Sequence, residues 1–124
     1  MGTNNQQEAR RYKRWDIFEY ALITTGASID PEPVIIVDLS LGGFQCRSKA
    51  PYSSGEICIV SISRPDGEPL TVRAEVRYVA PIPQTALHIA GMRFNPASVE
   101  QRVSLVNYIH ERFQADIERI ALES

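Results

Sequence analysis

Strand-like segments joined by short turns make up most of the chain between residues 15 and 94. Six segments are rich in β-branched, aromatic or alternating apolar residues, and Gly, Pro, Asp or Ser residues separate them. They cover residues 15–25, 34–37, 44–48, 56–63, 70–79 and 85–94. No helical pattern lies between them, so we expect neighbouring strands to pair antiparallel and the sheet to close, which removes its unpaired edges. The sequence therefore predicts a mainly β fold, a six-stranded antiparallel barrel over about residues 15–94.

Two of these segments predict which side chains are buried. Residues 34–37 form a continuous apolar run, which is typical of a strand buried on both faces, and this run stops at Asp38. Residues 70–79 alternate between apolar and charged side chains, which predicts one core face and one wet face. The predicted core face holds Val72, Ala74, Val76 and Tyr78.

A C-terminal helix is predicted over about residues 96–122, with Asn95 or, alternatively, Ser98 as its N-cap. Apolar or partly apolar residues recur along it at spacings of three and four. This stripe consists of Val99, Val103, Val106, His110, Phe113, Ile117 and Ile120. A helix of that length would extend about 40 Å at 1.5 Å per residue, which is more than a small barrel covers. We therefore expect the end of the stripe to form a homodimer contact or a docking face for a partner.

Length and composition fit one soluble domain. The chain has 124 residues, of which 44% are hydrophobic and 23% are charged. No apolar run approaches the roughly 18 residues of a membrane span, and the polar start of the chain lacks a signal-peptide pattern. These features predict a cytoplasmic protein without membrane insertion, with a flexible tail at residues 1–9 and a single domain over residues 10–124.

A basic cluster follows the predicted tail. Arg10, Arg11, Lys13 and Arg14 place four of the chain's 13 basic residues within five positions, although the formal net charge is −2. Such a run alone is typical of a solvated tail. A broad nucleic-acid surface does not fit an acidic protein, whereas a small anionic ligand or an acidic partner does. We expect this segment to act as a strap that becomes ordered when its ligand binds.

A polar turn motif, Asp38-Leu39-Ser40-Leu41-Gly42-Gly43, separates the second and third predicted strands. By itself it fits a turn in which Asp38 caps its own backbone. Beside the arginines it predicts a ligand site, because guanidinium groups match phosphate oxygens and the O6/N7 edge of guanine. The Asp38 carboxylate could accept hydrogen bonds from guanine N1–H and the N2 amine, with Ser40 beside it. Gly43 would allow close backbone approach or a positive φ.

The two motifs together resemble a known signature. Arg10-x-x-x-Arg14 followed by Asp38-x-Ser40-x-x-Gly43 resembles the two-part signature of the PilZ domain, a bacterial receptor module for cyclic di-GMP. The sequence Gly-Met-Arg-Phe at residues 91–94 is similar to the end of the family's last strand, so the resemblance covers roughly residues 9–115.

The resemblance implies a PilZ-like barrel with a C-terminal helix that binds cyclic di-GMP. Arg10 and Arg14 would clamp guanine edges and phosphates, with Arg11 and Lys13 auxiliary. The turn residues Asp38, Ser40 and Gly43 would hold the remaining guanine. Both one nucleotide and a stacked pair are compatible with these residues.

The predicted output is regulation of an unidentified effector protein in trans. The alternative is a PilZ-fold interaction module that does not bind nucleotide. We predict no enzymatic activity, because the sequence contains no phosphate loop, nucleophile elbow or paired catalytic carboxylates. We also predict no cofactor and no metal site, since His88 and His110 lack further ligands at suitable spacing, and Cys46 and Cys58 fit small buried hydrophobic residues.

Overall fold

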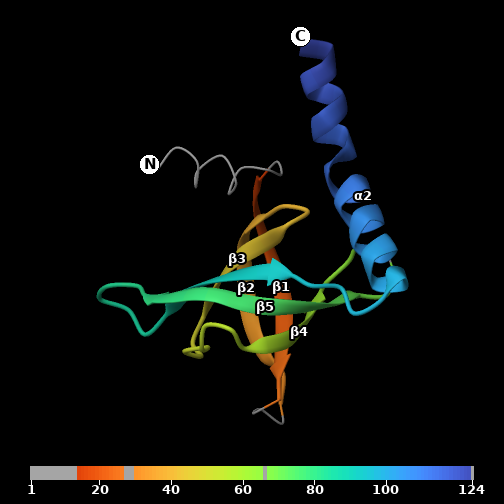
Figure 1. The fold of residues 1–124 in the computed structure, drawn as a ribbon. Helices are drawn as coiled ribbons and strands as arrows, with labels where there is room; N and C mark the ends of the chain where they lie inside the picture. Colours follow the sequence, from red (N-terminus) through yellow and green to blue (C-terminus); the bar gives the residue numbers. More distant parts are fainter. Residues whose placement is uncertain (1–13, 27–29, 66, 124) are drawn as a thin grey trace, which may run out of the picture.

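The computed structural model describes residues 14–26, 30–65 and 67–123, which form a barrel with a helix along one side (Figure 1). The strands pair antiparallel in the closed order β1-β2-β3-β6-β5-β4. They are β1 (Trp15–Thr25), β2 (Glu32–Leu39), β3 (Gly43–Ser48), β4 (Ile57–Ile62), β5 (Leu70–Pro81) and β6 (His88–Phe94). The helix α2 (Val99–Glu123) follows the last strand. This arrangement confirms the predicted six-stranded barrel with a C-terminal helix.

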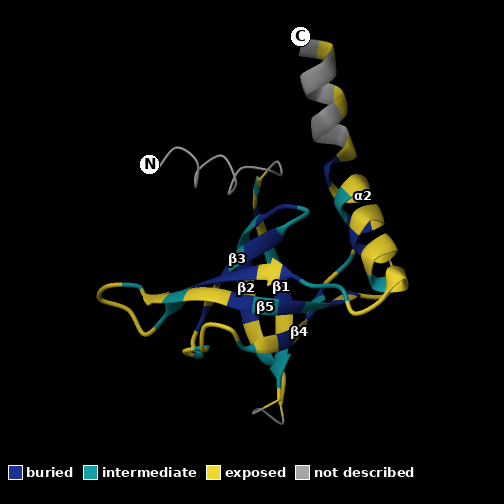
Figure 2. Cartoon of the chain, in the orientation of Figure 1, coloured by how far each residue is buried: buried dark blue, intermediate teal, exposed yellow. Residues whose placement is uncertain are grey.

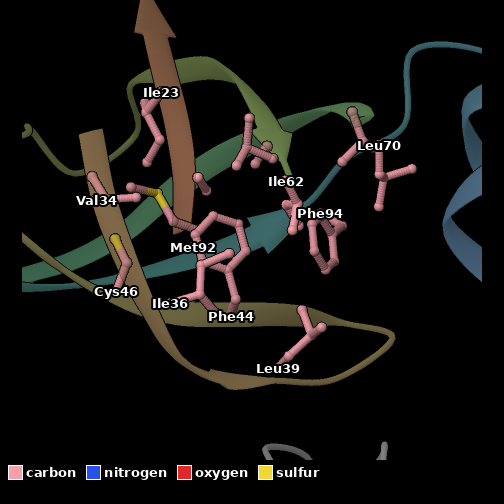
Figure 3. Close-up of a cluster of buried hydrophobic side chains, with 14 of the residues drawn as sticks. Ile23, Val34, Ile36, Leu39, Phe44, Cys46, Ile62, Leu70, Met92 and Phe94 are labelled. Atoms are coloured by element: carbon pink, nitrogen blue, oxygen red, sulfur yellow. The ribbon is translucent and has the colours of Figure 1, made fainter. Parts of the chain in front are cut away.

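The barrel interior is filled by one cluster of apolar side chains contributed by all six strands (Figure 3). Phe44 and Phe94 pack with their ring centroids 5.3 Å apart. Cys46 and Cys58 are buried free thiols, and burial raises their pKa values to about 12 and about 11. The two cysteines are therefore buried hydrophobic residues, as predicted.

Strand β2 differs from its prediction in two ways. Val34 and Ile36 face the interior, but Ile35 lies on the outer surface and is 38% exposed. The expectation of burial on both faces was wrong because no second layer covers this side of the barrel among the described residues. The strand also continues through Leu39, so Asp38 lies within the strand and not after it.

Tyr78 does not face the core, so this prediction was also wrong. The β5–β6 register shifts between Val76 and Tyr78, which marks a β-bulge. A bulge inserts one unpaired residue and reverses the alternation beyond it. Val76 is consequently fully buried, whereas Tyr78 lies outside and is 45% exposed.

Helix α2 begins at Val99, and its N-cap is Ser98, the alternative to Asn95 in the sequence prediction. The Gln101 backbone N–H donates to Ser98 Oγ at 3.1 Å, which satisfies one of the free N–H groups of the first turn. Asn95 instead accepts a hydrogen bond at its carbonyl oxygen from Arg73 Nε.

Among the described residues, the buried face of α2 shares only Phe113 with the predicted stripe. Leu105, Tyr108 and Phe113 are buried, and the Phe113 ring stacks on Trp15 of β1 at 4.5 Å between centroids. The first part of the predicted stripe is exposed, as Figure 2 shows along the first turns of the helix. Its members are Val99, Val103 and Val106. Phe113 therefore needs no second molecule to cover it, and the side chains of Ile117 and Ile120 lie outside the described set.

The C-terminal end of α2 projects past the strands (Figure 1). No helix within the described ranges is both long and apolar enough to cross a membrane.

Candidate ligand-binding site

Strand pairing brings the end of the basic cluster to the turn motif. Arg14 directly precedes β1, whose first residues, Trp15 and Asp16, pair with Leu39 and Asp38 of β2. Arg14 Nη1 donates a hydrogen bond to Asp38 Oδ1 at 2.9 Å. The side chains are 45% and 19% exposed, respectively. An ion pair this accessible adds at most about 1 kcal/mol to stability, so a ligand could replace either partner at little cost.

A second β-bulge places Asp38 on the outer surface. The β2–β3 register shifts between Ile36 and Asp38, so the two residues do not share a face although they lie two positions apart. Ile36 points into the core, and Asp38 instead lies opposite Gln45 of β3. Local backbone irregularity, and not simple alternation, therefore presents this carboxylate to solvent.

Ser40 organises the turn. Its side chain is 2% exposed, and the backbone N–H groups of Gly42 and Gly43 donate to its Oγ at 3.1 and 3.2 Å. The hydroxyl in turn donates to the Gly43 carbonyl oxygen at 3.2 Å. These bonds fix the path of the chain between Asp38 and β3. A direct contact between Ser40 and a ligand stays a prediction.

Gly43 is needed because β3 approaches β6 closely. A Cβ atom on Gly43 would lie 2.1 Å from the Met92 carbonyl oxygen. Within the described ranges the glycines with positive φ are Gly55 and Gly67, so of the two predicted reasons for Gly43 only close approach holds here. The approach is to the β6 backbone, and a ligand contact again stays a prediction.

Two further residues, Gln45 and Tyr78, extend the site across the outer face of the barrel. Asp38, Gln45, Gly91 and Tyr78 are successive register partners on β2, β3, β6 and β5. Gln45 Nε2 donates a hydrogen bond to Tyr78 Oη. The Tyr78 ring covers Gly91, where a Cβ atom would lie 2.1 Å from Tyr78 Cε1. The four residues form a continuous row, which we call the outer row.

The Tyr78 phenol responds to the charges of the site. Burial raises its pKa, the hydrogen bond from Gln45 and the charge of Arg14 lower it, and the charge of Asp38 raises it further. The net shift is upward, so the hydroxyl stays protonated at neutral pH.

The sequence analysis missed Gln45 and Tyr78. Gln45 could have been found, because it lies between the buried residues Phe44 and Cys46 and must therefore face outward. No local signal marks the bulge that turns Tyr78 outward.

The arrangement suits recognition of a planar, anionic ligand. Arg14 supplies a donor fork, Asp38 and Gln45 supply hydrogen-bonding groups, and the half-exposed Tyr78 ring offers an apolar face. No group of three or more His, Cys, Asp or Glu side chains that could hold a metal ion occurs among the described residues. Arg10 and Arg11 lie outside those residues, so the structure does not place them relative to this row.

Residues 8–111 match the sequence model of the PilZ domain. The chain belongs to the PilZ domain family. The resemblance identified from the two motifs is thereby confirmed. A comparison with curated protein sequences gives no significant match.

Solved structures with the same fold are PilZ proteins of low sequence identity. The PilZ domain of YcgR from Escherichia coli, solved with c-di-GMP, superposes with a TM-score of 0.67 at 17% identity, over 90% of this chain and 97% of that one. The K. pneumonia MrkH–c-di-GMP complex gives 0.69 at 12% identity, covering 89% and 54%. The Bacillus subtilis inhibitor of motility MotI/DgrA gives 0.65 at 18%, covering 86% and 51%. This PilZ chain spans about half the length of MrkH and MotI. At these identities the likeness establishes the fold alone.

Proposed function

We propose that this PilZ protein is a cyclic di-GMP receptor that changes conformation when the nucleotide binds and then regulates a partner protein in trans. The observation that carries the proposal is the solvent-accessible Arg14–Asp38 pair, which joins the two signature motifs beside the Tyr78 ring. Membership of the PilZ family supports it, as do the relatives YcgR and MrkH, which were solved with c-di-GMP.

In this proposal the ligand replaces a weak internal ion pair. Arg14 turns from Asp38 to a guanine edge or a phosphate, and Arg10 and Arg11 supply further guanidinium groups. The released Asp38 carboxylate accepts hydrogen bonds from guanine N1–H and N2. Ser40 and Gly43 hold the turn that presents Asp38, and Tyr78 offers its ring to a base.

Strand β1 transmits the movement of the basic segment to helix α2. Trp15 directly follows Arg14 and stacks on Phe113 of α2, so movement of the basic segment acts on the helix that a partner would meet. Ligand affinity and partner affinity are then coupled, and each changes the other by the same factor. The receptor occupies residues 10–124 as one domain, works in the bacterial cytoplasm and does not turn over its ligand.

Self-association is a second output that we include in the proposal. Val99, Val103 and Val106 form an exposed apolar row on α2 at helical spacing. A homodimer through this row would dissociate in a Val103→Glu variant, as sedimentation velocity would reveal.

The alternative function is a PilZ interaction module that does not bind nucleotide. The observation in its favour is that the charge of Asp38 is already neutralised by Arg14 and that the Ser40 hydroxyl is already used in the turn.

Calorimetric titration with cyclic di-GMP separates the two functions. The wild type should bind it saturably and show no comparable heat with GTP, whereas Arg10→Ala/Arg14→Ala should lose binding. Arg47→Ala, which removes an exposed guanidinium from β3 outside the outer row, should bind normally. The molar ratio distinguishes one nucleotide from a stacked pair. A folded wild type with neither heat nor thermal shift would leave the interaction module as the function.

A further inference from the structure

A pocket lies between the β4–β5 connection and helix α2, and it shares no lining residue with the outer row. Its volume is about 250 Å³, and its walls are formed by Arg64, Pro65, Tyr108, Glu111 and Arg112. Pockets for drug-sized ligands usually measure about 300–1,000 Å³. This one therefore fits a single functional group better than a nucleotide.

Two buried hydrogen-bond donors of this pocket have no acceptor. Tyr108 is 3% exposed, and neither its Oη nor Arg64 Nε has a partner within the described part of the chain. The two side chains are neighbours, since the Arg64 guanidinium carbon lies 5.5 Å from the centre of the Tyr108 ring. Folded proteins rarely leave buried donors unpaired, because each one loses its bonds to water. Two such donors together indicate an acceptor that is not among the described residues.

The charges around the pocket indicate what charge the missing acceptor carries. Arg64 and Arg112 bring two positive charges, Glu111 brings one negative charge, and Glu19 of β1 lies 3.9 Å from Arg112. The four charges cancel, so the pocket has no excess positive charge to balance a dianion such as phosphate. A carboxylate carries one negative charge and two acceptor oxygens, which match the paired N–H groups of a guanidinium.

We propose that this pocket binds a carboxylate group. The Arg64 guanidinium and the Tyr108 hydroxyl donate to its oxygens, and Arg112 supplies the second positive charge. Arg64, which is only partly buried, shifts off the Tyr108 ring to admit the ligand. The carboxylate is either a small free acid or an Asp or Glu side chain of a partner protein. The proposal does not depend on cyclic di-GMP binding, because it uses none of the same residues.

The test follows the arginine Nε–H signals of the ¹⁵N-labelled protein by NMR during titration. The probes are acetate, N-acetyl-aspartate N-methylamide and inorganic phosphate, each up to about 50 mM, so that a Kd near 1 mM is saturated. Both carboxylates should shift the Arg64 signal saturably. Affinity for the blocked aspartate at least about tenfold above acetate assigns the site to a partner's side chain, and similar affinities assign it to a free acid. No saturable shift, or phosphate binding as tightly as acetate, overturns the proposal.

Tyr108→Phe removes one donor and keeps the ring. Carboxylate affinity should fall roughly tenfold, the usual effect of losing a hydrogen bond to a charged group. The Tm should stay equal or rise, because an unpaired buried hydroxyl is gone. Arg64→Lys, which keeps the charge and lacks Nε–H, should weaken binding similarly when the titration is followed through the Arg112 Nε–H signal, and the exposed Arg47→Lys should not. Unchanged affinity in Tyr108→Phe, or a clearly lower Tm, contradicts the proposal, since the hydroxyl would then have no role or an internal partner.

Discussion

Gly43 and Gly91 would each bring an added Cβ atom equally close to a neighbouring atom, but the consequences differ. A Cβ atom would meet the Met92 carbonyl oxygen at 2.1 Å from Gly43, and Tyr78 Cε1 at 2.1 Å from Gly91. The first obstacle is backbone of a paired strand, which cannot move without breaking the β3–β6 ladder. The second is a half-exposed side chain, which can rotate away. Close packing of the barrel therefore restricts Gly43 more severely than Gly91.

We predict that Gly43→Ala lowers the free energy of unfolding by about 2 kcal/mol or more, as backbone overpacking does. Gly91→Ala should cost less than about 1 kcal/mol, but it should displace the Tyr78 ring and break its hydrogen bond from Gln45. Urea unfolding measures the first effect, and the NMR shifts of the Gln45 side-chain amide report the second. Equal destabilisation by the two variants would contradict this account.

The buried thiols make stability depend on alkaline pH. Burial raises the pKa of Cys46 to about 12 and that of Cys58 to about 11, above the ordinary thiol value of 9.0. The unfolded thiols therefore ionise first, so their contribution to stability is complete below pH 9 and is lost as the pH rises toward 11 and 12. We predict a fall of about 1.4 kcal/mol per pH unit for each thiol within that window. Urea titrations at several pH values would measure the slope, which should be smaller in Cys46→Ala.

At the scale of elements, sequence patterns predicted the apolar rows that every strand of a closed barrel turns inward. They missed the β-bulges, which depend on how particular strands pair. Apolar, β-branched or alternating runs bounded by turn residues located all six strands, and β1 has the predicted bounds, because an interior-facing row must be apolar. The outward positions of Asp38 and Tyr78 depend on bulges, which are set by the register with a partner strand distant in sequence. The sequence motifs thus predict Arg14 and Asp38 as site residues, but they do not predict the outer row that joins Asp38 to Tyr78.

Helix α2 illustrates the same limit. Its sequence contains two apolar faces, one through Val99, Val103 and Val106, and one through Leu105, Tyr108 and Phe113. Only the second packs on the body of the molecule, where Trp15 of β1 meets Phe113. Which face is buried depends on that distant tryptophan, so helical periodicity alone could not select it.

We predict that the Trp15–Phe113 stack stabilises the packing of the middle of α2 against β1. A double-mutant cycle of Trp15→Ala and Phe113→Ala should give a coupling energy of about 0.5–1.5 kcal/mol, the range of aromatic pairs. Ser104→Ala, at an exposed position of α2 outside the apolar row, should change stability by less than about 0.5 kcal/mol. Additive effects of the two aromatic substitutions would mean that the stack does not hold the helix.

At the scale of the whole molecule, β1 links the candidate site to the helix. Its first residues stand beside Asp38 and carry the tryptophan that Phe113 covers, and Glu19 further along pairs with Arg112. The strand is paired with both β2 and β4 only from Ala21 onward, so the freedom to respond to a ligand lies at its N-terminal end. A signal from Arg14 therefore has a short path to α2 that does not require the barrel to deform.

We predict that cyclic di-GMP changes the hydrogen exchange of α2 amides around Phe113, and that Phe113→Ala abolishes this change while nucleotide affinity stays within about threefold. The reason is that Phe113 lies outside the outer row and stacks on Trp15, so its loss breaks the relay without removing a contact of the outer row. Saturating nucleotide at about 100 times Kd should still stabilise both proteins by about 2.7 kcal/mol, which serves as the control for binding. Ser104→Ala, at an exposed position of α2 outside the apolar row, should behave as the wild type in both measurements. If Phe113→Ala retains the full exchange response, the signal leaves the site by another route. If it loses affinity together with the response, the helix contributes to the binding site itself.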